Sequence, residues 1–267
     1  MTSTVTRMMR NFPREAEFNY TVHICEELKF IFFSNPICAC STLKASLNQS
    51  TARALGIDFE MRRAEDIHKR AANILRTPRS LGYERFQKML EAPDVLKFCF
   101  VRDPVARFAS AFHKKLRRDN NFTRKVRAHL GVAAGVPVEE FLTIEGFAAR
   151  VREDPALRDL DEHWRLQRKQ VCFDEVPDME VGFVEDFQRD SRRIFDRIFG
   201  TGAYTMINAV DLNPQNTSRT RPGARTIPDS VRNDVAVAYA ADYRMIEQCR
   251  AGGEEAGSRP ANEGIRT

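Results

Sequence analysis

Two short segments of the chain place small, hydroxylic and basic side chains where an apolar run changes to a helical pattern. The first is the loop SNPICACSTLK at residues 34–44, which follows the apolar run LKFIFF. Backbone N–H groups at a helix N-terminus point at a ligand, and the helix dipole favours negative charge. The segment fits an anion site, but alone it favours an ordinary strand–helix turn with a Ser or Thr cap. It is not an ATP-binding loop, because it lacks the glycines and the GKS or GKT of such a loop. The residues expected to contribute are Pro36, Cys38, Ala39, Cys40, Ser41, Thr42 and Lys44.

The second segment, RDPVARFASAF, follows the apolar run VLKFCFV. Asp103 is suited to cap a helix that begins at Pro104. Arg102 then lies at the carboxyl end of a strand, where open α/β sheets bind their ligands, and Ser110 follows eight residues later on the helix. One guanidinium and one hydroxyl at such a junction are suited to hold a terminal phosphate.

Taken together, these two segments resemble the nucleotide-binding motifs of sulfotransferases that use 3′-phosphoadenosine-5′-phosphosulfate (PAPS). PICACSTLK corresponds to the 5′-phosphosulfate motif and RDPVARFASAF to the 3′-phosphate motif. Three later segments follow in the family's order: DEHWRLQ with a trailing Cys172, VGFVEDF and YAADY. The resemblance covers roughly residues 28–247 and is closest to the carbohydrate sulfotransferases of the chondroitin/dermatan 4-O type.

This resemblance implies transfer of a sulfuryl group from PAPS to a hydroxyl of a saccharide or glycoconjugate, with no metal. Such a transfer needs a base for the acceptor proton and donors for the departing phosphate. His68, which lies between the two nucleotide motifs, and His163, which stands beside two acids and the only tryptophan, are equal candidates for the base. Glu65 and Asp66 are the reserve candidates. The residues expected to bind the acceptor are Trp164, whose ring face could stack on a sugar, and Arg165.

Ile37 departs from the pattern of the family, which usually has a lysine at this position to assist the leaving group. Lys44 is the nearest cation in sequence and is expected to take this catalytic role. The alternative is a degenerate relative that binds nucleotide or glycan without transfer. A nucleotide-dependent phosphoryl transferase is a weaker alternative, because the Gly-Lys-Ser/Thr element is missing.

The elements that must position these residues are strands alternating with helices. Apolar runs predict buried strands at 28–33, 95–101 and 179–184, and helices are expected to follow at 41–55, 104–116 and 187–199. The segments 60–92 and 117–170 have a mostly helical pattern. The prediction is an α/β, three-layer, parallel-sheet nucleotide-binding fold, the P-loop-like fold of sulfotransferases, with helical insertions. Its expected divisions are a flexible arm at 1–20, one sulfotransferase domain at 21–250 and a disordered tail at 251–267.

Composition agrees with an anionic ligand. The 267 residues carry a net charge of +5, and 33 of the 42 cations are arginine. This bias is too mild to demand nucleic acid, and no nucleic-acid motif accompanies it. A basic cluster suits an anionic acceptor, but equally a solvated helix face; its members are Lys114, Lys115, Arg117, Arg118, Arg124, Lys125 and Arg127. Without an apolar run of about 18–20 residues or a secretory leader, we expect a soluble, cytoplasmic protein with no transmembrane segment.

Overall fold

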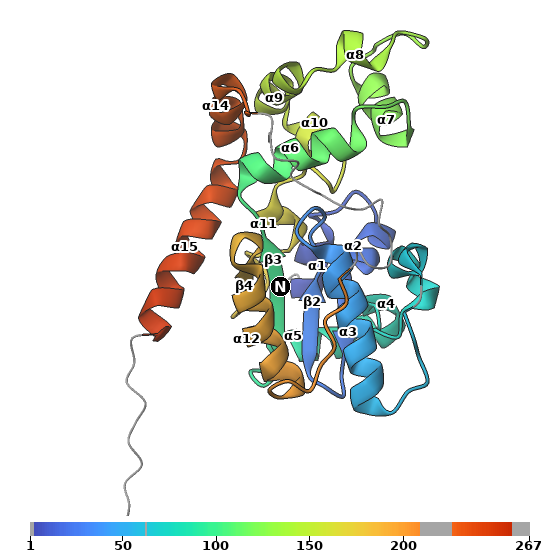
Figure 1. Cartoon of the computed structure of the whole chain (residues 1–267), viewed down its shortest axis with the longest axis vertical. Helices are drawn as coiled ribbons and strands as arrows, with labels where there is room; N and C mark the ends of the chain where they lie inside the picture. The colour runs from blue at the N-terminus through green and yellow to red at the C-terminus, as the bar shows by residue number, and fades with distance from the viewer. Residues whose placement is uncertain (1–2, 62, 209–225, 258–267) are drawn as a thin grey trace, which may run out of the picture.

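The central element of the structure is a four-stranded sheet in the order β1-β2-β3-β4 (Figure 1). The computed structural model describes residues 3–61, 63–208 and 226–257. Strands β2 (Phe30–Phe33), β3 (Leu96–Val101) and β4 (Glu180–Phe183) are parallel, and β1 (Val22–Cys25) pairs antiparallel with β2. The three strands predicted from apolar runs are confirmed. Strand β1 was not predicted, because His23 interrupts its short apolar pattern.

Helices cover both faces of this sheet and complete three layers. On one face, phenylalanines from β2 and β3 pack against α3 (Cys40–Leu55) and α12 (Phe187–Phe199). On the other face, the alternate residues of the same strands pack against α1 (Thr4–Met9), α2 (Glu15–Thr21) and α5 (Tyr83–Glu91). Strands buried on both faces have continuous apolar sequences, which is why they were visible in the sequence. The predicted α/β fold class is confirmed.

A second group of helices has its own hydrophobic core and lies above the sheet in Figure 1. Phe108, Phe147, Trp164 and Tyr239 are among the buried side chains of this core. Its helices are α6 (Pro104–Lys115), α7 (Asn121–His129), α8 (Val138–Phe141), α9 (Ile144–Glu153), α10 (Pro155–Asp159) and α14 (Asp229–Ala238). The remaining elements are η1 (Ala64–His68), η2 (Arg70–Ala72), α4 (Pro78–Leu81), α11 (Gln167–Gln170), η3 (Val184–Asp186) and α15 (Ala240–Gly257).

Both predicted ends of the domain need correction. Val5, Met8 and Phe18 from α1 and α2 are buried in the core beneath the sheet, so the described part of 1–20 is not a flexible arm. Apolar residues were present there, but their helices are too short to show a clear period. At the other end, α15 continues to Gly257, which makes 251–257 helical, and 258–267 lie outside the described residues. Across the described ranges, no helix is both long enough and apolar enough to span a membrane.

Candidate functional site

The two predicted nucleotide motifs emerge side by side. Strands β2 and β3 are parallel neighbours, so the loop after Phe33 and the turn after Val101 leave the same edge of the sheet. In the first loop the backbone is left-handed at Ile37, with φ of 69°, and at Ala39, with φ of 56°. Left-handed residues in such a turn help to point successive N–H groups into an anion-binding concavity. Helix α3 then begins at Cys40 without a side-chain cap, which leaves its positive end for an anion.

Arg102 and Ser110, predicted to hold a phosphate, are in contact. The Arg102 Nη1 atom donates to Ser110 Oγ at 3.1 Å. The helix that carries Ser110 is capped as expected, because Asp103 Oδ1 accepts from the N–H of Ala106 at 2.8 Å. Lys114, from the last turn of the same helix, also faces this position, and desolvation followed by the charge of Arg102 lowers the pKa of its ammonium group. The junction therefore brings two cations and one hydroxyl together.

Gln167 is the residue that joins the two motifs. Its fully buried Oε1 accepts from Asn35 Nδ2 at 3.0 Å and from the N–H of Arg102 at 3.0 Å, and Cys38 Sγ lies 3.3 Å away. Its Nε2 donates to the carbonyl of Arg102 at 2.8 Å. The backbone N–H of Gln167 itself donates to Asp242 Oδ2 at 2.9 Å. One carboxamide therefore fixes the first loop relative to the second.

Arg107 provides a second connection, between the first loop and the 161–167 segment. Its guanidinium is 2% exposed and donates to three carbonyls: that of Pro36 at 3.2 Å, that of Arg165 at 2.7 Å and that of Glu162 at 2.8 Å. A charged group that satisfies backbone acceptors in this way stabilises the loops it bridges. The 161–167 segment is thereby held against the first motif.

Lys44 is a buried cation without a carboxylate partner among the described residues. Its side chain is almost fully enclosed, and its Nζ lies 4.2 Å from the ring centroid of Tyr20. Desolvation lowers the pKa of Lys44. A buried ammonium group that no carboxylate pairs with gains from an anion, because an anion replaces the solvation lost on folding. Lys44 therefore has the environment expected of a ligand-binding cation.

His68 bridges two hydroxyls at the same site. Its Nδ1 lies 3.0 Å from the Tyr20 hydroxyl, and its Nε2 lies 3.1 Å from Ser41 Oγ. Desolvation, followed by the charges of Lys44 and Lys115, lowers the pKa of His68 to about 4. The imidazole is therefore neutral at physiological pH, and both of its nitrogens are engaged.

His163 has one engaged nitrogen. Its Nδ1 lies 2.7 Å from Asp161 Oδ1, and the other oxygen of Asp161 pairs with Lys125 Nζ at 2.7 Å. Hydrogen bonding to His163 and Lys125 outweighs desolvation and holds the pKa of Asp161 well below its usual range. A carboxylate on Nδ1 leaves Nε2 as the acceptor of the ring. After desolvation and the two lysines, the charge of His163 also lowers the pKa of His68, so the two histidines lie within electrostatic range of each other.

Glu162 is a third titratable group beside this site. Its charge adds to desolvation in raising the pKa of Tyr20, and it partly offsets the desolvation that lowers the pKa of Lys44, so Glu162 lies within electrostatic range of both. Its Oε2 atom is buried and has no hydrogen-bond partner within the described ranges. By contrast, Asp66, a reserve candidate for the base, pairs on the surface with Arg63 at 2.9 Å and Lys69 at 3.2 Å, and Glu65 is exposed beside it.

Trp164 and Arg165 have different surroundings from those predicted. The Trp164 ring is 0% exposed; its Nε1 donates to the carbonyl of Leu157 at 2.9 Å, and Phe147 packs edge-on against it. No face is left for a sugar. Arg165 is 1% exposed and pairs with Glu17, so it also belongs to the interior. Their sequence neighbours face the site, but these two side chains hold the 161–167 segment in place.

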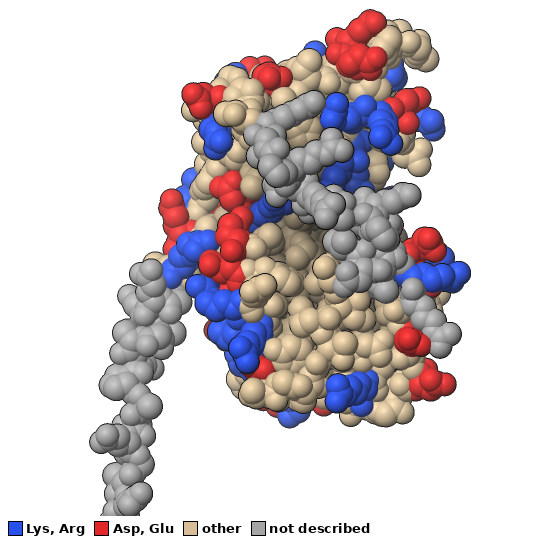
Figure 2. All heavy atoms as spheres, viewed as in Figure 1, with Lys and Arg blue, Asp and Glu red and all other residues tan. Residues whose placement is uncertain are grey.

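The basic cluster divides into residues near the site and residues away from it. Lys115 acts electrostatically on His68 and Lys114 lies near Arg102, whereas Lys125 is occupied by Asp161. Figure 2 shows Lys and Arg side chains gathered where α6 and α7 meet. A small hollow of about 270 Å³ lies there, lined by His113, Lys114, Arg117, Arg118 and Asn120.

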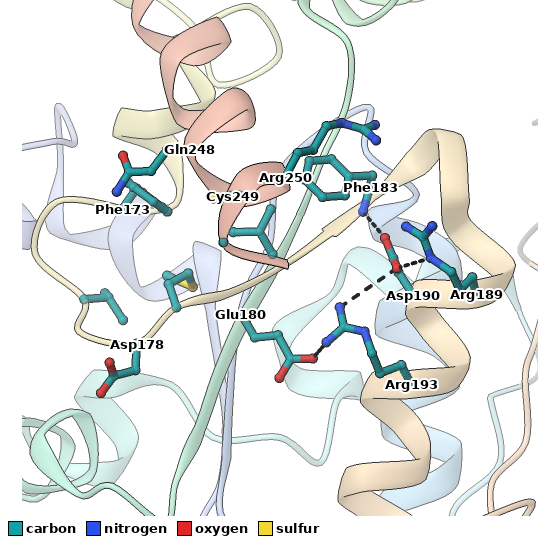
Figure 3. A pocket seen from close by; sticks show the side chains of 14 residues that line it. Phe173, Asp178, Glu180, Phe183, Arg189, Asp190, Arg193, Gln248, Cys249 and Arg250 are labelled. Atoms are coloured by element: carbon teal, nitrogen blue, oxygen red, sulfur yellow. Dashed lines mark hydrogen bonds and ion pairs between the residues drawn. The ribbon is translucent and has the colours of Figure 1, made fainter. Parts of the chain in front are cut away.

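A larger cavity lies away from the two motifs. It is a groove of about 1000 Å³ between β4, the first half of α12 and the middle of α15 (Figure 3). Its charges are largely satisfied within the protein: Arg189 pairs with Asp190 at 3.0 Å, Arg193 pairs with Glu180, and Asp190 accepts from the N–H of Phe183 at 2.8 Å. No residue of the two nucleotide motifs lines it. Within the described ranges, no cluster of His, Cys, Asp and Glu could hold a metal ion.

Comparison with known proteins assigns the family. A model described as "Sulfotransferase family" matches residues 5–246. The chain therefore belongs to the sulfotransferase family. The match begins within α1, which agrees with the structural role of that helix and places the start of the family region before the predicted residue 21. Searches of curated proteins and of solved structures returned no significant match.

Sequence reasoning missed several residues of the site. Tyr20 lay in a segment interpreted as an arm, and Glu162 and Lys115 were noted only as neighbours or members of a cluster. Gln167 carried no chemical signal, since a single glutamine is ordinary in any sequence. Its place at the end of the DEHWRLQ segment, next to residues with an expected role, was the only available sign.

Replacing Gln167 with methionine tests its connecting role. We expect Gln167→Met to lower the free energy of unfolding by about 2–4 kcal/mol, because it leaves buried partners on both loops unsatisfied. Affinity for an adenosine 3′,5′-bisphosphate should fall as well. Gln170→Met is the matched control: Gln170 is equally buried on the same helix but bonds Arg165 and Thr21. If both variants lose nucleotide affinity equally, Gln167 has no special role in joining the motifs.

His23 should make the stability of the fold depend on pH. It is buried, accepts from Arg70 and packs against Phe32, and desolvation with the charges of Lys44, Arg70 and His68 lowers its pKa well below the ordinary value. Above about pH 6.5, the ordinary pKa of histidine in the unfolded chain, His23 is neutral in both states and its low pKa does not affect stability. Below about pH 6.5 the unfolded chain binds a proton that the folded chain does not bind, so the free energy of unfolding falls as the pH falls. We expect a loss on the order of 2 kcal/mol per such group between pH 7 and 5.

Chemical denaturation at pH 5, 6 and 7 measures this loss. A His23→Gln variant should lose less stability over that interval than the wild type, whatever its stability at pH 7. An equal or steeper loss would show that His23 titrates normally in the folded protein.

Proposed function

We propose that this sulfotransferase transfers a sulfuryl group from PAPS to a hydroxyl of a carbohydrate or glycoconjugate. The observation that carries the proposal is the contact of Arg102 with Ser110 beside the uncapped start of α3 and the buried Lys44. These groups suit a donor with two separate phosphates. In the proposed arrangement, Arg102 and Ser110 hold the 3′-phosphate, and the first loop with Lys44 holds the 5′-phosphosulfate.

The transfer step needs one base and stabilisation of one leaving group. The acceptor oxygen attacks sulfur, His163 Nε2 takes the hydroxyl proton, and the bond from sulfur to the bridging phosphate oxygen breaks. Asp161 fixes the His163 ring and stabilises its protonated form. Lys44 and the N–H groups of the first turn of α3 stabilise the charge that grows on the phosphate. His68 is the poorer base in this proposal, because both of its nitrogens already have partners.

The proposed acceptor is a saccharide that carries negative charge. The likeness of five ordered segments to carbohydrate sulfotransferases supports a saccharide, and Lys114 and Lys115 beside the site favour an acceptor with negative charge. Stacking on Trp164 is no longer part of the proposal, since that ring is buried. The sugar must be recognised by other groups.

Ile37 favours a second candidate, a relative that binds nucleotide without transfer. Its backbone lies in the left-handed region, which costs a β-branched residue roughly 1–3 kcal/mol and persists only where surrounding contacts enforce it. The loop therefore keeps a shape suited to an anion without the cation that the family usually places there. Turnover by the wild type separates the two candidates.

The donor assignment is tested by ligand binding. We expect 3′-phosphoadenosine-5′-phosphate (PAP) to bind the wild type, and Arg102→Ala to weaken it by about 1.5–3 kcal/mol, or roughly 10–150-fold, through loss of charge-assisted hydrogen bonds. Adenosine 5′-phosphosulfate, which lacks the 3′-phosphate, should be much less affected. Isothermal titration calorimetry measures both ligands.

Arg189→Ala is the matched control, because Arg189 lines the large groove and lies outside both motifs. If this variant loses PAP affinity and Arg102→Ala does not, the nucleotide binds in the groove and the assignment is wrong. If Arg102→Ala lowers the affinity for both ligands equally, Arg102 does not bind the 3′-phosphate.

Replacing the proposed base should separate chemistry from binding. His163→Ala should lower turnover by roughly 10²–10⁴ while PAP affinity stays near wild type. Asp161→Asn should also lower turnover, because it removes the charge that orients the His163 ring. The measurement is transfer of labelled sulfate to a panel of saccharides. A loss of turnover in Glu162→Gln with activity kept in His163→Ala would identify Glu162 as the base instead.

A further inference from the structure

Three side chains from distant parts of the chain form a hydrogen-bonded row at the donor loop. Tyr20 comes from α2, His68 from η1 and Ser41 from the first turn of α3. The distances are 3.0 Å from the Tyr20 hydroxyl to His68 Nδ1 and 3.1 Å from His68 Nε2 to Ser41 Oγ. His68 contacts α2 through Tyr20 and the start of α3 through Ser41, so a hydrogen bond at each ring nitrogen fixes the orientation of the ring.

We propose that Tyr20 and His68 are positioning residues that aim the hydroxyl proton of Ser41 at the phosphosulfate of the donor. The proposal rests on the proposed function, since it presupposes a donor in the first loop. Nothing in the family match assigns a role to Tyr20, and sequence reasoning offered His68 only as a base.

The direction of the row follows from the acidity of its members. A phenol is a stronger donor than an aliphatic hydroxyl, so Tyr20 donates to His68 Nδ1. The neutral ring then carries its proton on Nε2 and donates to Ser41 Oγ. Ser41 Oγ accepts this bond through one of its lone pairs, and its own proton stays free for an oxygen of the donor. The opposite direction would point the Ser41 proton at His68 and away from the donor.

Lys44 fixes the first member of the row. Its ammonium lies 4.2 Å from the centroid of the Tyr20 ring, a distance suited to a cation–π contact. Burial, followed by the charge of Glu162, raises the pKa of Tyr20, so the phenol stays protonated and able to donate. The cation that the donor needs and the phenol that starts the row are therefore held by the same contact.

One observation and two expected outcomes distinguish positioning by His68 from general-base catalysis. A base requires a free lone pair aimed at the acceptor hydroxyl, and His68 has both nitrogens engaged. A glutamine can replace the Nε2–H as a donor to Ser41, but it cannot accept a proton from an acceptor. Loss of the Tyr20 hydroxyl should have no effect on the donor once Ser41 is replaced, because Tyr20 and His68 act on the donor only through Ser41.

The first test compares two replacements of His68. His68→Ala should raise the PAP dissociation constant or lower turnover by about 2–10-fold. His68→Gln should restore most of this loss. His129→Gln, at a histidine that pairs with Asp154 between α9 and α10, is the matched control. If His68→Gln is as inactive as His68→Ala, and both lose roughly 10²-fold or more in turnover, His68 is the base and the proposal is overturned.

The second test is a double-mutant cycle on PAP affinity, which does not require turnover. Tyr20→Phe keeps the ring over Lys44 and removes only the hydroxyl. It should weaken PAP in the wild type but have no further effect in Ser41→Ala. Tyr83→Phe is the control for loosening of α2, because the Tyr83 hydroxyl bonds Glu15 and Asn19 of that helix. Additive effects of Tyr20→Phe and Ser41→Ala, or an equal effect of Tyr83→Phe, would overturn the row.

Nitrogen-15 spectra of the histidine rings report the row in the free protein. We expect His68, assigned by its absence in His68→Gln, to show a single Nε2–H tautomer that becomes mixed in Tyr20→Phe. An Nδ1–H tautomer in the wild type contradicts the proposed direction. These outcomes are distinct from failure of the proposed function, which would appear as no PAP binding by a protein whose His68 tautomer is as expected.

Discussion

Satisfaction of one buried carboxamide is the constraint on which the geometry of the site depends. The side chain of Gln167 must reach the loop after β2 and the turn after β3 at once, and it can do so only if those strands are parallel neighbours that end together. Its own backbone is held by Asp242 from α15. Because a buried amide without partners costs about 1–3 kcal/mol for each group, the loops cannot separate without loss of stability.

The same hydrogen-bond network explains why several residues of the family-like segments are buried in the core. The Tyr239 hydroxyl donates to the carbonyl of Trp164 at 2.5 Å, so the C-terminal YAADY segment is tied to the DEHWRLQ segment. Glu185 accepts from the N–H of Asp103 at 2.9 Å and ties the turn after β4 to the second motif. A segment can therefore resemble the corresponding segment of a family because it holds the site together, even if it touches no ligand.

The sequence predicted the parts of the fold that have a strong local signal. Long apolar runs revealed β2, β3 and β4, and the Asp-Pro pair located the start of α6, so the contact of Arg102 with Ser110 followed from helical spacing. The roles of Tyr20 and Gln167 depend on tertiary contacts across 48 and 132 residues of chain, respectively, and no local pattern encodes them. Trp164 was misjudged because aromatic rings serve sugars and cores equally well.

One electrostatic field gives the two histidines different tasks. Desolvation, followed by the charges of Lys44 and Lys115, lowers the pKa of His68 to about 4, and in the proposed mechanism these two cations also attract the anionic donor. A histidine among cations is kept neutral and is free to relay a hydrogen bond, but it is penalised for holding a proton. His163 stands beside the ionised Asp161, which compensates the charge that a base acquires. Binding the donor and accepting the proton thus require opposite local charge, and the 161–163 turn supplies the negative part within a site that is otherwise positive.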